Sequence, residues 1–87
     1  MAKYEALLAR ILSGTADASI GFSELCNLLE RLGFEQRIRG SHHIFTKDGI
    51  AEILNLQPKG RNAKPYQVKE VRTVIVKYRL SGGIDGQ

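Results

Sequence analysis

Hydrophobic side chains recur at helical spacing in three stretches, and each stretch predicts an α-helix. The stretches are residues 3–12, 23–32 and 65–80. Their apolar stripes consist of Tyr4, Leu7, Leu8, Ile11 and Leu12 in the first, Leu25, Leu28, Leu29 and Leu32 in the second, and Val68, Val71, Val74, Ile75 and Tyr78 in the third. We expect Ser23 to cap the second helix, Gly33 to end it, and Pro65 to occupy the first turn of the third.

Between the second and third helices the pattern changes to the alternation that is typical of strands. Three strands are predicted, over residues 34–39, 42–47 and 50–57, joined by the turns Gly40-Ser41 and Lys47-Asp48-Gly49. A basic loop is predicted for residues 58–62. The predicted fold is therefore α+β, with a three-stranded antiparallel sheet packed on helices.

This order divides the chain into three parts. Residues 1–19 form an N-terminal helix and a polar connector, residues 20–80 form the main domain, and residues 81–87 form a flexible tail. The α-β-β-β-α order of residues 20–80 is shared with double-stranded RNA-binding domains.

The composition narrows the class of protein. The chain has 87 residues, enough for one small domain. We expect no membrane partner, because no apolar run approaches the roughly 18 residues that span a bilayer, and no signal peptide. The lone Cys26 has no partner for an internal disulfide and suits a reducing, cytoplasmic setting. Its place beside the leucine stripe indicates a core residue rather than a nucleophile.

The charge is concentrated in the C-terminal part of the chain. Residues 1–34 carry three Lys or Arg against four Asp or Glu, a net charge of −1, whereas residues 35–87 carry ten against five, a net charge of +5. A basic region of this kind attracts polyanions such as nucleic acid in a salt-dependent way. It can also serve simply as a well-solvated surface.

The two histidines, His42 and His43, are adjacent and follow the Gly40-Ser41 turn. Histidine moves protons near neutral pH, and RNA carries its own nucleophile, the 2′-hydroxyl, so one histidine beside backbone N–H groups and cations could support ribonuclease chemistry. On a strand the two side chains point to opposite faces. Both neighbours, Ile44 and Phe45, are apolar, so the pattern leaves open which histidine faces solvent. Two ordinary strand histidines are the simpler alternative.

Diverging strand histidines, with no further His or Cys to complete a ligand set, predict neither a metal site nor a cofactor.

The segment that contains these residues resembles the HicA toxins, the mRNA interferases of type II HicBA toxin–antitoxin systems. The resemblance covers about residues 20–80 and rests on three features: a leucine-lined helix ending in Gly33-Phe34, the run from Arg39 to Phe45, and the basic loop followed by a Val/Ile-lined helix. It implies a double-stranded RNA-binding-domain-like fold, translation-linked cleavage of mRNA, and neutralisation by a HicB-like antitoxin.

The resemblance also implies roles for particular residues. The family's catalytic histidine matches His42, and His43 remains a candidate because some relatives have asparagine at the first position. Gly40 and Ser41 would shape the phosphate pocket. The residues expected to hold RNA phosphates are Arg37, Arg39, Lys59, Arg61 and Lys64. DNA is not expected as a partner of the protein by itself, and the oligomeric state is left open.

The chain departs from the family pattern at two places. Residues 1–19 extend beyond the shortest members, and the stretch Leu56-Gln57-Pro58-Lys59 lacks the histidine that many relatives carry near the proline after the third strand. Two other classes of protein therefore stay open: a non-catalytic RNA-binding module of the same fold, and an interaction protein whose basic surface meets an acidic partner.

Overall fold

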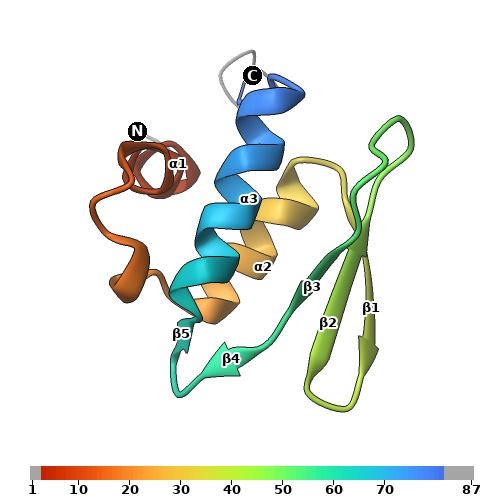
Figure 1. Ribbon diagram of the computed structural model, residues 1–87, viewed down its shortest axis with the longest axis horizontal. Helices are drawn as coiled ribbons and strands as arrows, with labels where there is room; N and C mark the ends of the chain where they lie inside the picture. Colours follow the sequence, from red (N-terminus) through yellow and green to blue (C-terminus); the bar gives the residue numbers. More distant parts are fainter. Residues whose placement is uncertain (1–2, 82–87) are drawn as a thin grey trace.

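The computed structural model describes residues 3–81 and confirms the predicted order of helices and the central sheet (Figure 1). The helices are α1 (Lys3–Ser13), the short 3₁₀ helix η1 (Asp17–Ser19), α2 (Phe22–Arg31) and α3 (Pro65–Lys77). The strands are β1 (Glu35–Arg39), β2 (His42–Thr46), β3 (Leu54–Leu56), β4 (Pro58–Lys59) and β5 (Asn62–Ala63). The predicted tail lies outside the described residues from position 82 onward.

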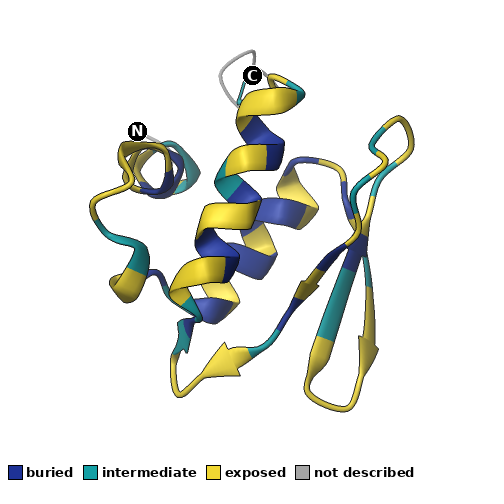
Figure 2. Ribbon diagram, viewed as in Figure 1, coloured by how far each residue is buried: buried dark blue, intermediate teal, exposed yellow. Residues whose placement is uncertain are grey.

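The molecule is an α+β fold with an extra N-terminal helix. In Figure 1, α2 and α3 lie between α1 on one side and the sheet of β1, β2 and β3 on the other. The buried residues lie where these elements face one another, as the dark blue parts of the ribbon in Figure 2 show. They include Leu7, Leu8 and Ile11 of α1, so the N-terminal helix is part of the core.

Helix α2 begins one residue earlier than predicted, and the prediction that Ser23 caps it is wrong. Gly21 is the N-cap, and no side chain among residues 3–81 forms a capping hydrogen bond there. Instead, the Phe22 N–H donates to the carbonyl of Arg61 (2.9 Å), which lies in the turn between β4 and β5. The start of α2 is therefore fixed by a long-range contact that local sequence does not reveal.

The end of α2 follows the prediction. Gly33 adopts a φ of 100°, which is the left-handed conformation that glycine accepts without strain. The N–H groups of Gly33 and Phe34 donate back to the carbonyls of Glu30 and Leu29, at 3.0 Å each. This Schellman pattern satisfies the last carbonyls of the helix.

The sheet is an antiparallel meander with β2 at its centre. β2 pairs with β1 from Glu35↔Thr46 to Arg39↔His42, and with β3 from His43↔Leu56 to Phe45↔Leu54. The third strand is shorter than the predicted 50–57, because residues before Leu54 follow the end of α3 instead of β2. Lys77 and Tyr78 donate hydrogen bonds to the carboxylate of Glu52 (2.8 and 2.7 Å) and hold this segment there.

The predicted basic loop at residues 58–62 is instead a two-stranded hairpin, in which β4 pairs with β5. The N–H of Ala63 also donates to the carbonyl of Ile20 (2.9 Å), so the hairpin is tied to the segment that precedes α2. Helix α3 starts at Pro65 as predicted but ends at Lys77 rather than Leu80. Arg79 has a φ of 54°, which turns the chain out of the helix.

Cys26 is buried in the core, which confirms its prediction as a structural residue. Burial, with a smaller contribution from the charge of Glu30, raises the pKa of its thiol to about 11. A thiol of this kind is a poor nucleophile at neutral pH because almost none of it is thiolate.

Candidate functional site

The two histidines point to opposite faces of the sheet, and the structure settles which one is outside. His43 is half-buried and shares the helix-facing side of β2 with Phe45, which is completely buried. His42 is exposed and shares the outer face with Ile44. Only His42 is therefore fully available to a large ligand.

His43 is held by contacts to a strand and a helix. Its Nδ1 lies 2.7 Å from Oε1 of Gln36 on β1. Its ring meets the ring of Phe22 on α2 edge to face, with 4.8 Å between the centroids. Gln36 in turn donates from Nε2 to Glu30 (2.8 Å). These contacts join the sheet to α2, so the environment of His43 is that of a packing residue.

His42 lies between two amide side chains of the neighbouring strand and its continuation. Its Nδ1 is 3.0 Å from Oδ1 of Asn55, and its Nε2 is 3.4 Å from Nε2 of Gln57. The same Gln57 nitrogen donates to the hydroxyl of Ser41 (3.1 Å), and Lys64 donates from Nζ to Oε1 of Gln57 (3.2 Å). Gln57 thus connects His42, the Gly-Ser turn and a cation.

The position of Gln57 is fixed from α3 by Gln67, which is only 3% exposed. The Gln67 side chain accepts from the N–H of Gln57 (3.0 Å) and donates to the carbonyl of Asn55 (3.1 Å). It therefore occupies the free edge of β3 as another strand would, and all its polar groups are paired as burial requires. Sequence reasoning missed this residue, although a glutamine in line with Val71 and Val74 on an apolar helix face was the available signal.

His42 opens onto a hollow of about 290 Å³ between β3 and the first half of α3. The side chains that line it are His42, Ile53, Asn55, Gln57, Tyr66, Gln67 and Glu70. Two of them are apolar and unusually exposed, Ile53 at 65% and Tyr66 at 58%. The hollow therefore combines an aromatic ring, a titratable ring and several hydrogen-bonding groups.

The Gly40-Ser41 turn places open backbone next to His42. Gly40 has a φ of 59°, and positive φ at only the first of two turn residues is the pattern of a type II′ hairpin turn, which favours glycine there. A Cβ atom built at Gly40 would meet no described atom within 4 Å. The turn is therefore open to solvent, and Ser41 lies within reach of the same ligand as His42.

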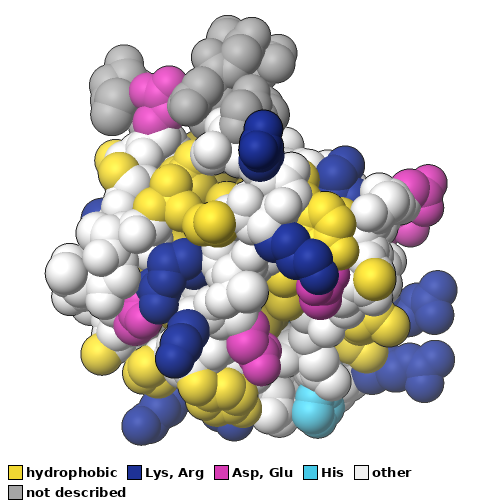
Figure 3. All heavy atoms as spheres, turned by 45° about the horizontal axis from the view of Figure 1, so that its top comes forward, with side chains coloured by type: hydrophobic (Ala, Val, Ile, Leu, Met, Phe, Trp, Pro, Cys, Tyr) yellow, Lys and Arg dark blue, Asp and Glu magenta, His cyan; other side chains and the backbone are white. Residues whose placement is uncertain are grey.

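The predicted phosphate-binding residues fall into two groups. Arg37 and Arg39 lie on the outer face of β1, where Arg39 is the strand partner of His42, and both line a hollow of about 390 Å³ on that face. Lys64 reaches the site through Gln57. In Figure 3 a histidine side chain is visible at the surface, with Lys and Arg side chains gathered at the neighbouring edge of the view.

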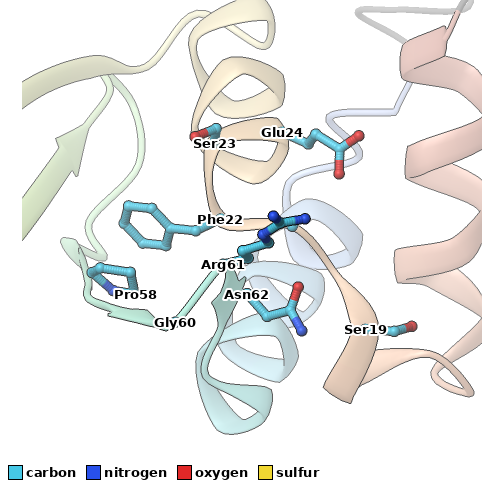
Figure 4. Close-up of a pocket in the computed structure, with 9 residues that line it drawn as sticks. Ser19, Phe22, Ser23, Glu24, Pro58, Gly60, Arg61 and Asn62 are labelled. Carbon is cyan, nitrogen blue, oxygen red and sulfur yellow. The ribbon is translucent and has the colours of Figure 1, made fainter.

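The second group, Lys59 and Arg61, lies on the β4–β5 hairpin. Arg61 lines a separate hollow of about 440 Å³. Figure 4 shows this hollow at the start of α2, with Phe22 and Asn62 beside Arg61. The structure therefore brings Arg37, Arg39 and Lys64 to the neighbourhood of His42, and places Lys59 and Arg61 on an adjoining surface.

Within residues 3–81, no three His, Cys, Asp or Glu side chains lie close enough together to hold a metal ion. None of the helices in this same range is long and apolar enough to cross a membrane.

Comparison with protein families matches residues 22–77 to the family described as HicA toxin of bacterial toxin–antitoxin systems. No curated protein and no solved structure gives a significant match to the chain. The matched region runs from the first residue of α2 to the last residue of α3 and includes the turn, both histidines and Gln57. The chain therefore belongs to the HicA toxin family.

Proposed function

We propose that this protein is a metal-independent endoribonuclease toxin, an mRNA interferase, in which His42 is the acid–base residue. The observation that carries the proposal is the placement of His42. It is exposed, it opens onto a hollow that can hold part of a substrate, and it stands beside cations and an open Gly-Ser turn. Family membership supports the same reading.

The proposed reaction uses the nucleophile that RNA itself carries. His42 accepts the proton of a 2′-hydroxyl, and that oxygen attacks the neighbouring phosphorus while the bond to the 5′-oxygen breaks. The leaving 5′-oxygen takes up a proton, which the protonated ring of His42 can return. The products are a 2′,3′-cyclic phosphate and a 5′-hydroxyl end. The balanced reaction includes no metal and no cofactor.

The negative charge that grows on the phosphate needs nearby donors. Lys64 and Arg39 are the cations best placed for this, because one is joined to His42 through Gln57 and the other is its strand partner. Backbone N–H groups of Gly40 and Ser41 are the second source of donors. Arg37, Lys59 and Arg61 then hold flanking phosphates, and their contribution is expected to weaken as salt rises.

The hollow beside His42 favours an unpaired base over a base-paired one. Proteins hold single-stranded bases by stacking them on exposed aromatic rings and by hydrogen bonds to their edges. Tyr66 provides the ring, Ile53 a second apolar contact, and Glu70 an acceptor at the rim. Glu70 would repel a phosphate, so a base is the better occupant of this part of the site.

A protein that covers the RNA-binding surface around His42 would inhibit the proposed cleavage. A HicB-like antitoxin that seats on the outer face around His42 blocks RNA without altering the fold. This surface is basic at Arg37 and Arg39 and apolar at Ile53 and Tyr66, so acidic and apolar side chains are expected on the antitoxin.

Induced expression of the wild type and of His42→Ala in a bacterial host tests the proposal, with growth and mRNA integrity followed together. We expect the wild type to arrest growth with loss of mRNA, and the variant to do neither while unfolding at the same temperature. If both proteins are harmless but bind RNA equally, the non-catalytic RNA-binding module is the better account. If both are toxic, His42 is not the reacting group.

A further inference from the structure

We infer that Lys64, acting through the side chain of Gln57, sets the tautomer of His42, with the hydrogen on Nδ1 and a bare Nε2. The consequence for catalysis rests on the proposed function, but the tautomer itself does not. Gln57 and Lys64 are thereby positioning residues.

The argument begins at Lys64, because its chemistry allows only one orientation of the next group. A lysine ammonium has three N–H donors and no acceptor. The Gln57 atom that lies 3.2 Å from Nζ of Lys64 must therefore be the amide oxygen. The amide oxygen accepts hydrogen bonds and the amide nitrogen donates them, so this contact fixes the orientation of the amide group.

The amide nitrogen of Gln57 then faces the other way, toward Ser41 Oγ at 3.1 Å and Nε2 of His42 at 3.4 Å. An amide NH₂ group only donates. Nε2 of His42 can meet it favourably only as an acceptor, which in a neutral imidazole means that this nitrogen carries no hydrogen.

The hydrogen of the neutral ring must then reside on Nδ1, and Asn55 accepts it. Oδ1 of Asn55 lies 3.0 Å from Nδ1, which is a good distance for an N–H···O hydrogen bond. Both ends of the ring therefore require the same tautomer. It is the less common one, because the hydrogen of a free histidine side chain prefers Nε2.

The two amides can act on one ring because of their place on the chain. Asn55 and Gln57 are two residues apart, so their side chains project from the same face. Gln67 binds the carbonyl of Asn55 and the N–H of Gln57 from α3. Gln67 thereby fixes the backbone at the two residues whose side chains contact His42.

This tautomer suits the reaction proposed above. A bare Nε2 is ready to accept the proton of a 2′-hydroxyl, and the long 3.4 Å contact with Gln57 is easily exchanged for the substrate oxygen. The Nδ1–H···Oδ1 bond with Asn55 persists when the ring becomes charged. In the same way, a catalytic histidine keeps the hydrogen bond at the ring nitrogen that does not exchange the proton.

Nitrogen NMR of the histidine rings measures the tautomer directly and requires no RNA. The protein is labelled with ¹⁵N and recorded at a pH where the rings are neutral, so that each ring nitrogen reports whether it bears hydrogen. We expect Nδ1–H for His42 in the wild type. A wild-type His42 that carries its hydrogen on Nε2 would overturn the inference.

Two variants, with a matched control, test this relay, in which Lys64 orients Gln57 and Gln57 sets the tautomer of His42. In Gln57→Glu the group facing Nε2 accepts only, so the hydrogen should move to Nε2, and RNA cleavage should fall by about 10²-fold or more. In Lys64→Met the amide of Gln57 loses the cation that orients it, and a larger share of His42 than in the wild type should carry its hydrogen on Nε2. Lys59→Met removes the same charge from exposed β4 and should leave the His42 tautomer as in the wild type.

The readouts separate this inference from the proposed function. The His43 ring signals and the backbone amide spectrum report whether each variant is folded. Equal tautomer populations in Lys64→Met and Lys59→Met would contradict the relay, whatever the activity. A wild type that shows Nδ1–H and responds to the variants but cleaves no RNA would confirm the relay and contradict only the nuclease.

Discussion

The rings of Phe22 and His43 meet edge to face, with 4.8 Å between their centroids and 82° between their planes. Because Nδ1 of His43 also lies 2.7 Å from Gln36 on β1, this ring connects α2 with two strands of the sheet. His42, one position earlier, makes its contacts on the outer face. Adjacent residues of the same type thus have separate structural and chemical surroundings.

This separation predicts a larger loss of stability for His43→Ala than for His42→Ala. His43→Ala should lower the free energy of unfolding by about 1–3 kcal/mol, since it removes an aromatic pair and a hydrogen bond. His42→Ala should change it by less, because its side chain is exposed. Urea unfolding of both variants measures the difference. A His43→Ala protein as stable as the wild type but unable to cleave RNA would instead make His43 the reacting group.

The sequence predicted the helices and the opposed histidines well, because both depend on local periodicity. It could not predict which histidine faces solvent, since the neighbours Ile44 and Phe45 are both apolar. That outcome depends on where α2 packs: of these two neighbours, Phe45 is completely buried and Ile44 is partly exposed. Sequence patterns report amphipathic faces but not which partner covers them.

Several features that the sequence did not predict depend on contacts between distant residues. β3 is short because Glu52 binds Lys77 and Tyr78, which are 25 and 26 positions away. The hydrogen bonds of Gln57 with Ser41 and Lys64 likewise join separate elements. The sequence shows only that no histidine lies near Pro58, and it gives no sign that Gln57 contacts His42, Ser41 and Lys64.

The N-terminal segment is fastened to α3 by one ion pair. Arg72 donates from Nη1 and Nη2 to the two carboxylate oxygens of Asp17 (2.8 and 3.1 Å), and from Nη1 to the carbonyl of Ile11 (3.0 Å). The hydrogen bonds from Arg72 lower the pKa of Asp17. The guanidinium thus binds both the end of α1 and the connector that follows it.

Arg72→Met should therefore loosen α1 and destabilise the fold by roughly 1–3 kcal/mol, as expected for hydrogen bonds to a charged group. Amide hydrogen exchange should be faster in the variant than in the wild type, and this increase should be larger in residues 3–19 than in the rest of the protein. Lys69→Met, which removes a charge from the same helix, is the matched control. Equal losses in the two variants would mean that charge alone, and not the bidentate contact, holds the segment.

Glu52 makes the stability of the fold depend on pH. Hydrogen bonds from Lys77 and then Tyr78 lower the pKa of its carboxyl from 4.5 to about 2. Since the folded pKa lies below the unfolded value, the ionised carboxylate stabilises the fold above about pH 4.5. That contribution is lost as the pH falls from about 4.5 toward 2.

Glu52→Gln should consequently be less stable than the wild type at pH 7, and the difference should shrink steadily below pH 4.5. Urea midpoints at pH 7 and pH 3 measure this, with Glu35→Gln on exposed β1 as the control for loss of an acid. A difference that stays constant over this pH range would show that the carboxylate is not bound in the folded protein.

Tyr66 tests whether a base occupies the hollow beside His42. A base stacked on an aromatic side chain contributes about 1–3 kcal/mol to binding, so Tyr66→Ala should weaken the binding of a short single-stranded RNA correspondingly. Tyr66→Phe keeps the ring and should bind nearly as the wild type does. Both are made in the His42→Ala background, so that the RNA stays intact while fluorescence anisotropy measures affinity at a low and at a raised salt concentration.

The pair of variants separates stacking from the other roles of this side chain. The Tyr66 hydroxyl accepts a long hydrogen bond from Gln67 (3.5 Å), so a loss that depended on this contact would appear in Tyr66→Phe as well. If neither variant binds less tightly, the exposed ring serves another occupant, and the antitoxin becomes the first candidate. Loss confined to Tyr66→Ala, and unchanged when salt is raised, is the signature of stacking, because phosphate contacts weaken with salt and ring contacts do not.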